Sequence, residues 1–409
     1  MKRCASARHT MAKTLGLGLA LFATLCFSAA MAGPREQAKR IHDRIAGVPP
    51  SAAVLATMQS RITAGDAVGA ALLATDAPEF FNVTLKNHAA PWTNREGDVF
   101  VPLNDYTATV IGLVRDNADF RDVLSGDVIY LGSGNGVPAY NPANNSHHAA
   151  LESQGVNLAT NLTATTQSAV SGLPSEATAG VMTTRQGARA FFIDGTNRAM
   201  LRFTLMNHLC HDMEQLQDTS RAADRIRQDV SRSPGGDSRI FLNNCVGCHS
   251  GMDPLAQGFA YHDFEYNRAT DPDATSGSVH FNSAGTTDAA TGTRVEAKYF
   301  NNDTTFEPGF ITPDDAWVNY WRAGRNALLG WDPALPGRGN GAKSLGEELA
   351  HSDAFAACHV EKVFTNVCLR PVQDATDRAQ VANMTTSFRN NGFQLRRVFA
   401  EAAVYCMGD

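Results

Sequence analysis

The residues with the clearest chemistry in this sequence are Cys245, Cys248 and His249, which form a C-x-x-C-H motif. This pattern is typical of covalent attachment of a c-type haem. Two thiols at this spacing can each form a thioether with one haem vinyl group, and the histidine that follows is placed to bind the iron. We therefore predict one covalent haem c, held by Cys245 and Cys248, with His249 as the proximal iron ligand.

Two other uses of such a cysteine pair fit the sequence less well. A zinc site needs about four ligands, whereas the other Cys-His neighbours, at 210–211 and 358–359, are adjacent dipeptides that chelate one tetrahedral ion poorly. A thioredoxin-like dithiol is expected within a βαβ pattern, which is absent around residue 245. Haem attachment is the interpretation that we retain.

The second axial ligand decides what a bound haem does. Electron-transfer c-type cytochromes usually take a methionine from a downstream loop, but no methionine occurs between Met252 and Met384, and Met252 lies on the proximal side, three residues after His249. We therefore expect a histidine opposite His249 and select His280, on a strand-like stretch. The alternatives are an open sixth position or one of four other side chains, His262, Met384, His208 and Met206.

Four further cysteines, Cys210, Cys358, Cys368 and Cys406, lie downstream of residue 32. An even number in an oxidising compartment favours disulfides. Cys358 and Cys368 are ten residues apart on one predicted helix, about 15 Å of axial rise, which is too far for a mutual bridge. If they are bridged, they must pair with Cys210 or Cys406; buried free thiols are the alternative.

The first 32 residues have the pattern of a signal peptide. A basic stretch up to Lys13 precedes an apolar run, and Ala30 and Ala32 are the small residues that a signal peptidase needs. We predict cleavage after Ala32 and a periplasmic or secreted location. No other apolar run approaches the ~20 residues that span a bilayer, so we expect no stable membrane insertion.

Composition supports a globular chain without affinity for nucleic acid. Hydrophobic residues make up 43% of the 409 residues and charged residues 19%, which argues against disorder or a coiled coil. Asp and Glu number 41 against 35 for Lys and Arg. An acidic balance of this kind gives no general attraction to nucleic acid or to anionic lipid.

Hydrophobic periodicity predicts a mainly helical protein. After the signal peptide we expect an N-terminal helical region (33–131), a loop excursion rich in Gly, Asn, Ser and Thr (132–180), a helical connector (181–235) and a cytochrome c-like haem domain (236–409). The pair His147-His148 falls in the excursion, where we expect it to be exposed and without function.

Local signals specify individual helices. Apolar spacing predicts one over 35–46, and Ser51 is expected to cap the next. A charged helix is predicted over 221–229. Thr312, followed by proline and two aspartates, predicts the start of another helix, which carries two of three clustered tryptophans, Trp317, Trp321 and Trp331. We expect these indoles to serve mainly as core residues.

Several segments resemble a known family. Residues 248–255 (CHSGMDPL), 179–183 (AGVMT), 209–210 (LC) and 352–358 (SDAFAAC) are together similar to the planctomycete-type cytochrome c proteins, which are built from consecutive domains of unknown function. The resemblance covers about the C-terminal 230 residues. It implies an exported, haem-binding protein and brings no established substrate.

The sequence predicts an exported monohaem c-type cytochrome that transfers electrons to or from a redox partner protein. A second C-x-x-C-H motif, which the familiar dihaem peroxidases require, is absent. One alternative is a peroxide-linked haem enzyme with an open iron position. Another is an envelope binding module in which the haem is structural.

Overall fold

The computed structural model describes residues 32–193, 197–300, 306–307 and 309–408. The expected signal peptide therefore lies, except for Ala32, outside the described residues. The described chain is mainly helical, as predicted, and none of its helices is long and apolar enough to cross a membrane. Its strands form three antiparallel pairs: β1 (Ile129–Gly132) with β2 (Leu162–Thr165), β3 (His262–Glu265) with β4 (Ser278–Phe281), and β5 (Ala316–Val318) with β6 (Arg338–Asn340).

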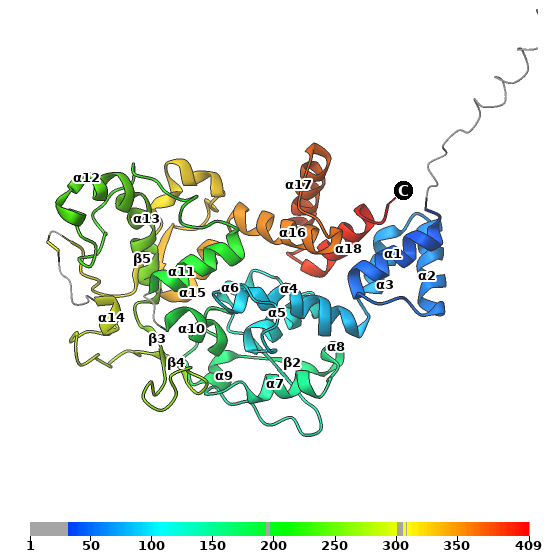
Figure 1. Cartoon of the computed structure of the whole chain (residues 1–409), viewed down its shortest axis with the longest axis horizontal. Helices are drawn as coiled ribbons and strands as arrows, with labels where there is room; N and C mark the ends of the chain where they lie inside the picture. Colours follow the sequence, from blue (N-terminus) through cyan, green and yellow to red (C-terminus); the bar gives the residue numbers. More distant parts are fainter. Residues whose placement is uncertain (1–31, 194–196, 301–305, 308, 409) are drawn as a thin grey trace, which may run out of the picture.

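Helices from the two ends of the chain pack together (Figure 1). They are α1 (Pro34–Ala46), α2 (Ala52–Thr63), α3 (Ala67–Ala74), α16 (Asp353–Cys368), α17 (Ala375–Asn390) and α18 (Leu395–Tyr405). Of these, α1, α2 and α3 lie at one end of the long axis, and α16 and α17 lie nearer its middle. The Arg40 guanidinium donates to the Met407 carbonyl oxygen over 3.0 Å. One continuous hydrophobic core runs from Ala38 to Ala403, so the N-terminal and C-terminal helices bury their apolar faces together.

The first helices begin and end where local signals place them. The Ser51 hydroxyl accepts a hydrogen bond from the Val54 N–H at 3.3 Å, so it caps α2 as predicted. α1 ends at Gly47, whose φ of 73° is left-handed, the conformation that glycine adopts at little cost.

Shorter helices occupy the centre of the molecule between the two ends of the long axis (Figure 1). They are α4 (Lys86–Ala89), α5 (Asp105–Arg115), α6 (Asp122–Ser125), α10 (Arg185–Phe192), α11 (Asn197–Thr204) and α15 (Gly341–Ala350), whereas α14 (Ala297–Phe300) lies near the end of the long axis opposite the chain termini. α5 is buried along almost its whole length. α15 approaches α6 so closely that a Cβ on Gly346 would overlap the Leu124 carbonyl.

Residues 132–180 are not the loop excursion that their composition suggested. They contain α7 (Ser146–Ser153), α8 (Leu158–Asn161), α9 (Gln167–Ser171) and β2. His147 and His148, expected to be exposed, are buried, and their ring nitrogens contact the backbone of β1 at Gly132 and Tyr130. Asn and Ser side chains in this segment bond to nearby backbone groups, which gives local order without apolar periodicity.

The charged helix predicted over 221–229 is also wrong, because these residues form turns. The Phe310 N–H donates to the Ile226 carbonyl oxygen at 2.9 Å, and the Gln228 N–H donates to the Phe310 carbonyl oxygen at 3.2 Å. The backbone is thus paired with a distant segment. Two of its charged side chains, Arg227 and Asp229, also take part in the ion-pair network described below.

The helix predicted from Thr312 is replaced by β5 and a short 3₁₀ turn (Tyr320–Arg322). Trp317 lies opposite Gly339 in the β5–β6 pair, and the open space at this glycine accepts the indole. Trp317, Trp321 and Trp331 are all buried, in agreement with their expected role in the core. The helical spacing of these aromatic residues thus arises from a strand followed by a tight turn.

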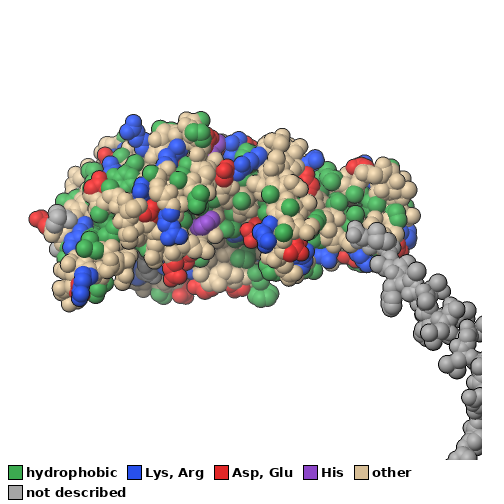
Figure 2. All heavy atoms as spheres, turned by 90° about the horizontal axis from the view of Figure 1, so that it is seen from above, with side chains coloured by type: hydrophobic (Ala, Val, Ile, Leu, Met, Phe, Trp, Pro, Cys, Tyr) green, Lys and Arg blue, Asp and Glu red, His purple; other side chains and the backbone are tan. Residues whose placement is uncertain are grey.

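The surface in Figure 2 shows basic and acidic side chains interspersed, without one large patch of either sign. This distribution follows from the nearly balanced composition, 35 Lys and Arg against 41 Asp and Glu. On this face no extended basic surface is available for a polyanion.

Two disulfides join the four cysteines outside the motif. Cys210 pairs with Cys358, with Cα atoms 5.3 Å apart, and Cys368 pairs with Cys406, with Cα atoms 5.4 Å apart. Cys358 and Cys368 both lie on α16, and each is bridged to a partner outside that helix, as the helical rise requires. The expectation of disulfides among these four residues is confirmed.

We expect the Cys210–Cys358 bridge to stabilise the fold more than the Cys368–Cys406 bridge. The two bridges join residues 148 and 38 positions apart. Loop-closure entropy then assigns the longer loop about 1 kcal/mol more, within an expected loss of about 2–5 kcal/mol for either bridge. Urea unfolding of C210S/C358S and C368S/C406S measures the difference. A larger loss in C368S/C406S would contradict this prediction.

Candidate haem site

The C-x-x-C-H motif lies at the start of α13 (Val246–Ala256), at the opposite end of the long axis from the chain termini (Figure 1). α12 (Ser238–Ile240) and a π-helical turn (Phe241–Cys245) lead directly into it. Phe241 is buried with Ile226, Val230 and Val246 in a small cluster that Cys245 contacts. The position of Cys245 is therefore fixed by packing against apolar side chains.

Cys245 and Cys248 are the two cysteines of the described chain outside the disulfides, and both are partly exposed. The Cys248 Sγ lies 3.7 Å from the Met213 carbonyl oxygen. Burial raises the pKa of the Cys248 thiol, so this sulfur is protonated at neutral pH. The pair is thus reduced and accessible, as thioether formation requires.

The His249 ring is held at one nitrogen and free at the other. Its Nδ1 lies 3.1 Å from an Asp253 carboxylate oxygen one helical turn later. Its Nε2 forms no hydrogen bond with any residue in the described part of the chain. Since the carboxylate accepts a hydrogen bond from Nδ1–H, the proton stays on Nδ1 and the lone pair is on Nε2, the ring atom that can bind a metal.

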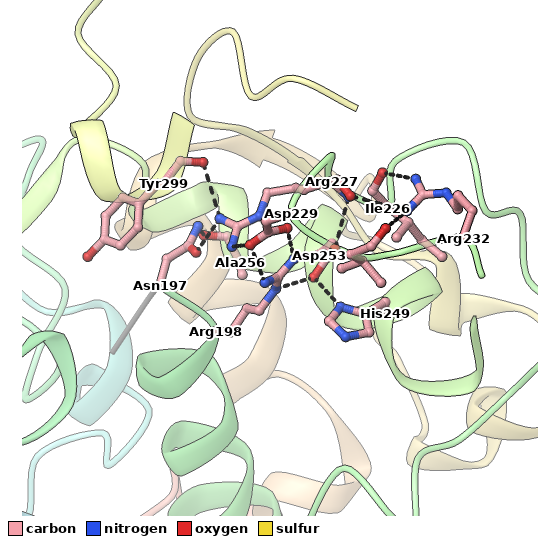
Figure 3. A network of polar contacts seen from close by, with 11 residues as sticks. Asn197, Arg198, Ile226, Arg227, Asp229, Arg232, His249, Asp253, Ala256 and Tyr299 are labelled. Atoms are coloured by element: carbon pink, nitrogen blue, oxygen red, sulfur yellow. Dashed lines mark hydrogen bonds and ion pairs between the residues drawn. The ribbon is translucent and has the colours of Figure 1, made fainter. Parts of the chain in front are cut away.

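Asp253 is buried and shares its charge with two arginines (Figure 3). Arg198 on α11 donates to its two carboxylate oxygens at 2.6 and 2.8 Å, and the Arg227 N–H donates at 3.1 Å. Burial by itself would raise the pKa of Asp253, but the charge of Arg198 and the contact with His249 hold that pKa well below its ordinary value. Asp253 is therefore a carboxylate at neutral pH.

A second carboxylate completes the network. Asp229 accepts hydrogen bonds from Arg198 at 2.7 and 2.9 Å and from Arg227 at 3.1 Å. Arg232 donates to the carbonyl oxygens of residues 226, 227 and 230 and so fixes the turn that carries Asp229. Buried charges are tolerated here because each is paired and hydrogen-bonded.

The other face of α13 is fixed by Trp321. A Cβ on Gly251 would overlap the Trp321 indole, so the helix rests directly on this ring. With Trp321 on one side and the Arg198–Asp253 pair on another, α13 has little freedom to rotate. The direction of the His249 side chain is set accordingly.

The structure does not bring the expected second ligand, His280, into contact with His249. His280 lies on β4, where its Nδ1 is 3.3 Å from Glu265 and its Nε2 is 3.1 Å from Asn282 and 3.7 Å from Glu296. Both ring nitrogens therefore already have polar partners. To bind iron, His280 would have to give up these contacts.

The other sequence candidates are placed differently. His262 is buried on β3, with its Nε2 2.9 Å from the Ala177 carbonyl oxygen. His208 is buried between Tyr106 and His359, at 2.7 and 3.2 Å. Met384 is buried on α17, whereas Met206 is half-buried after α11.

Sequence reasoning missed His211, whose ring resembles that of His249 in its bonding. Its Nδ1 is 2.6 Å from the Leu209 carbonyl oxygen, and its Nε2 has no hydrogen-bond partner among the described residues. It is half-buried and lines a cavity of about 550 Å³ with Leu216, Leu329, Arg325 and the 92% exposed Leu328. Two residues after it, Met213 contacts Cys248, so His211 belongs to a segment that borders the motif.

Known proteins offer no match to this chain. No family model, no curated protein sequence and no solved structure matches it. The functional interpretation therefore rests on the motif and on the geometry around it.

We expect Arg198 to be essential for the stability of this site. R198M leaves the carboxylates of Asp253 and Asp229 without their shared partner, and breaking a buried ion pair costs about 3–5 kcal/mol. R202M is the control, because Arg202 is 47% exposed where it pairs with Asp212, and such pairs contribute about 1 kcal/mol or less. Chemical unfolding measures both variants. Similar losses in the two would contradict the role of the network.

Proposed function

We propose that this protein is an exported monohaem c-type cytochrome that transfers electrons to or from a redox partner protein, in the periplasm or outside the cell. One haem c is attached at Cys245 and Cys248, and His249 binds its iron. The observation that carries the proposal is the pair of reduced cysteines followed by a histidine whose Nε2 is free. A bound haem supplies a one-electron iron couple there. The C-terminal region is accordingly proposed to be a cytochrome c-like haem domain.

Asp253 positions the proximal ligand. By accepting a hydrogen bond from the Nδ1–H of His249, it orients the ring and makes Nε2 a stronger donor. Arg198 shares the negative charge of Asp253, which moderates this effect. We expect His249 bonded to Asp253 to favour the ferric state of the iron more than a histidine without a carboxylate partner would.

For the second axial ligand we propose His211, in place of the sequence choice His280. The support is the free Nε2 of His211, its tether to a backbone carbonyl, and its position next to the segment that contacts Cys248. The cavity that it lines also contains leucines and Arg325, but Cys245, Cys248 and His249 are not among its lining residues. His280, by contrast, is already engaged by two glutamates.

The contact between Asp253 and His249 also favours a second candidate function. A proximal imidazole bonded to a carboxylate is a strong donor, which suits peroxide-linked chemistry at an open iron position. In that case His211 is a general base in the cavity rather than a ligand. Carbon monoxide binding to the reduced protein distinguishes the two functions, since only an open position binds it readily.

Haem attachment is tested by denaturing the protein in acid acetone. We expect the colour to stay with the polypeptide, because thioether bonds at Cys245 and Cys248 survive extraction. C245S/C248S should release all of its haem, whereas C368S/C406S, which removes a disulfide of the same chain, should keep it. Extraction of all haem from the unaltered protein would refute covalent attachment.

The second ligand is tested by near-infrared magnetic circular dichroism. We expect a low-spin bis-imidazole band in the ferric protein, lost or shifted in H211A and unchanged in H280A. A band lost in H280A but kept in H211A would restore the sequence choice. A high-spin ferric signature in the unaltered protein would favour the haem enzyme.

A further inference from the structure

A second cavity, of about 510 Å³, lies between α4 with the turn that follows it and α16. It shares no lining residue with the cavity beside His211. Trp92, Pro91 and Val99 provide apolar walls, and His88 and Lys362 provide polar groups. The haem proposal uses none of these side chains.

The Lys362 side chain, when protonated, has no counter-charge among the described residues. Its Nζ donates to the Asn207 carbonyl oxygen at 2.8 Å and lies 4.7 Å from the centre of the Trp92 ring. It forms no ion pair with any residue that the structure describes. An ammonium group withdrawn from water is costly unless a negative charge is near, so the site has a strong electrostatic preference for an anion.

His88 supplies a second unmet polar group. Its side chain is 7% exposed, and its Nε2 is buried without a hydrogen-bond partner. Burial, together with the charge of Lys362, lowers the pKa of His88 to about 3, so the ring is neutral at physiological pH. The neutral ring adds no charge to the cavity, so Lys362 is the group there that can attract an anion.

Trp92 is held as a rigid wall. The rings of His208 and His359 each lie 5.5 Å from it, edge to face, and His88 lies 5.0 Å from it on another side. A fixed indole beside an ammonium group suits a flat apolar body that ends in a negative charge. Glu361 also lines the cavity, but it is exposed and its carboxylate stays hydrated.

We propose that this cavity binds a small organic anion with a flat apolar body, of the aromatic carboxylate class. Its carboxylate pairs with Lys362, and its ring packs against the apolar wall of Pro91, Trp92 and Val99. The site is independent of the haem, so its test does not depend on the proposed function.

Isothermal titration of the full protein with benzoate, and with benzamide as a neutral match, tests the proposal. We expect benzoate to bind at least about tenfold more tightly than benzamide, since a charged hydrogen bond contributes about 1.5–3 kcal/mol. Equal affinities, or no measurable binding of benzoate, would overturn the proposal. The comparison uses the unaltered protein, so it holds even where a variant fails to fold.

Two neighbouring substitutions of opposite charge locate the site. K362Q should weaken benzoate binding at least about tenfold, whereas E361Q, one residue away, should bind at least as tightly as the unaltered protein. K362R keeps the positive charge and should retain binding. An unchanged affinity in K362Q would place benzoate elsewhere and overturn the assignment.

The affinity for benzoate should decrease as the pH rises. Burial lowers the pKa of Lys362 to about 7, so its charge, and with it the affinity for benzoate, should fall between about pH 6 and about pH 9. The facing histidines His88, His208 and His359 are neutral over this range, because burial lowers each of their pKa values. Glu361 is the other charged group at the cavity. K362R should remove the pH dependence, and persistence of the full effect would count against Lys362.

Discussion

The Asp253 carboxylate is buried and receives hydrogen bonds from Arg198, from the backbone of Arg227 and from the ring of His249. A buried charge needs all of these partners, because each unmet bond to an ionised group costs about 1–3 kcal/mol or more. Through this one group α11, the 226–232 turn and α13 are held together. The hydrogen bond that His249 donates to this buried carboxylate also sets the orientation of the proposed iron ligand.

The same requirement explains the irregular chain before the motif. Residues 221–232 have the composition of a surface helix, but Asp229 points inward to pair with Arg198 and with Arg227 of the same turn. A regular helix would spread these side chains around its axis. In the observed turn, the Arg232 guanidinium donates hydrogen bonds to carbonyl oxygens of the same turn and so fixes its shape. This shape brings the charged side chains together on the side that faces Arg198.

The sequence predicted correctly those features that depend on the spacing of residues within one helix. The helical rise between Cys358 and Cys368 excluded their mutual bridge, and the two observed disulfides obey that limit. The contact between His249 and Asp253 was not predicted, although residues four apart share a helical face. The pairing of Arg198 with Asp229 was also not predicted, because ion pairs between distant segments leave no periodic pattern. His147 and His148 were misjudged because their burial comes from strands and caps that composition conceals.

The placement of the chain ends has a practical consequence. The structure begins at α1 and ends after α18, two helices in contact, whereas α13 lies at the other extreme of the long axis (Figure 1). A tag, a fusion partner or a surface linker joined to α1 or after α18 would therefore be attached far from α13 (Figure 1). Protein immobilised on an electrode through that attachment would hold α13, and the C-x-x-C-H motif at its start, away from the electrode surface.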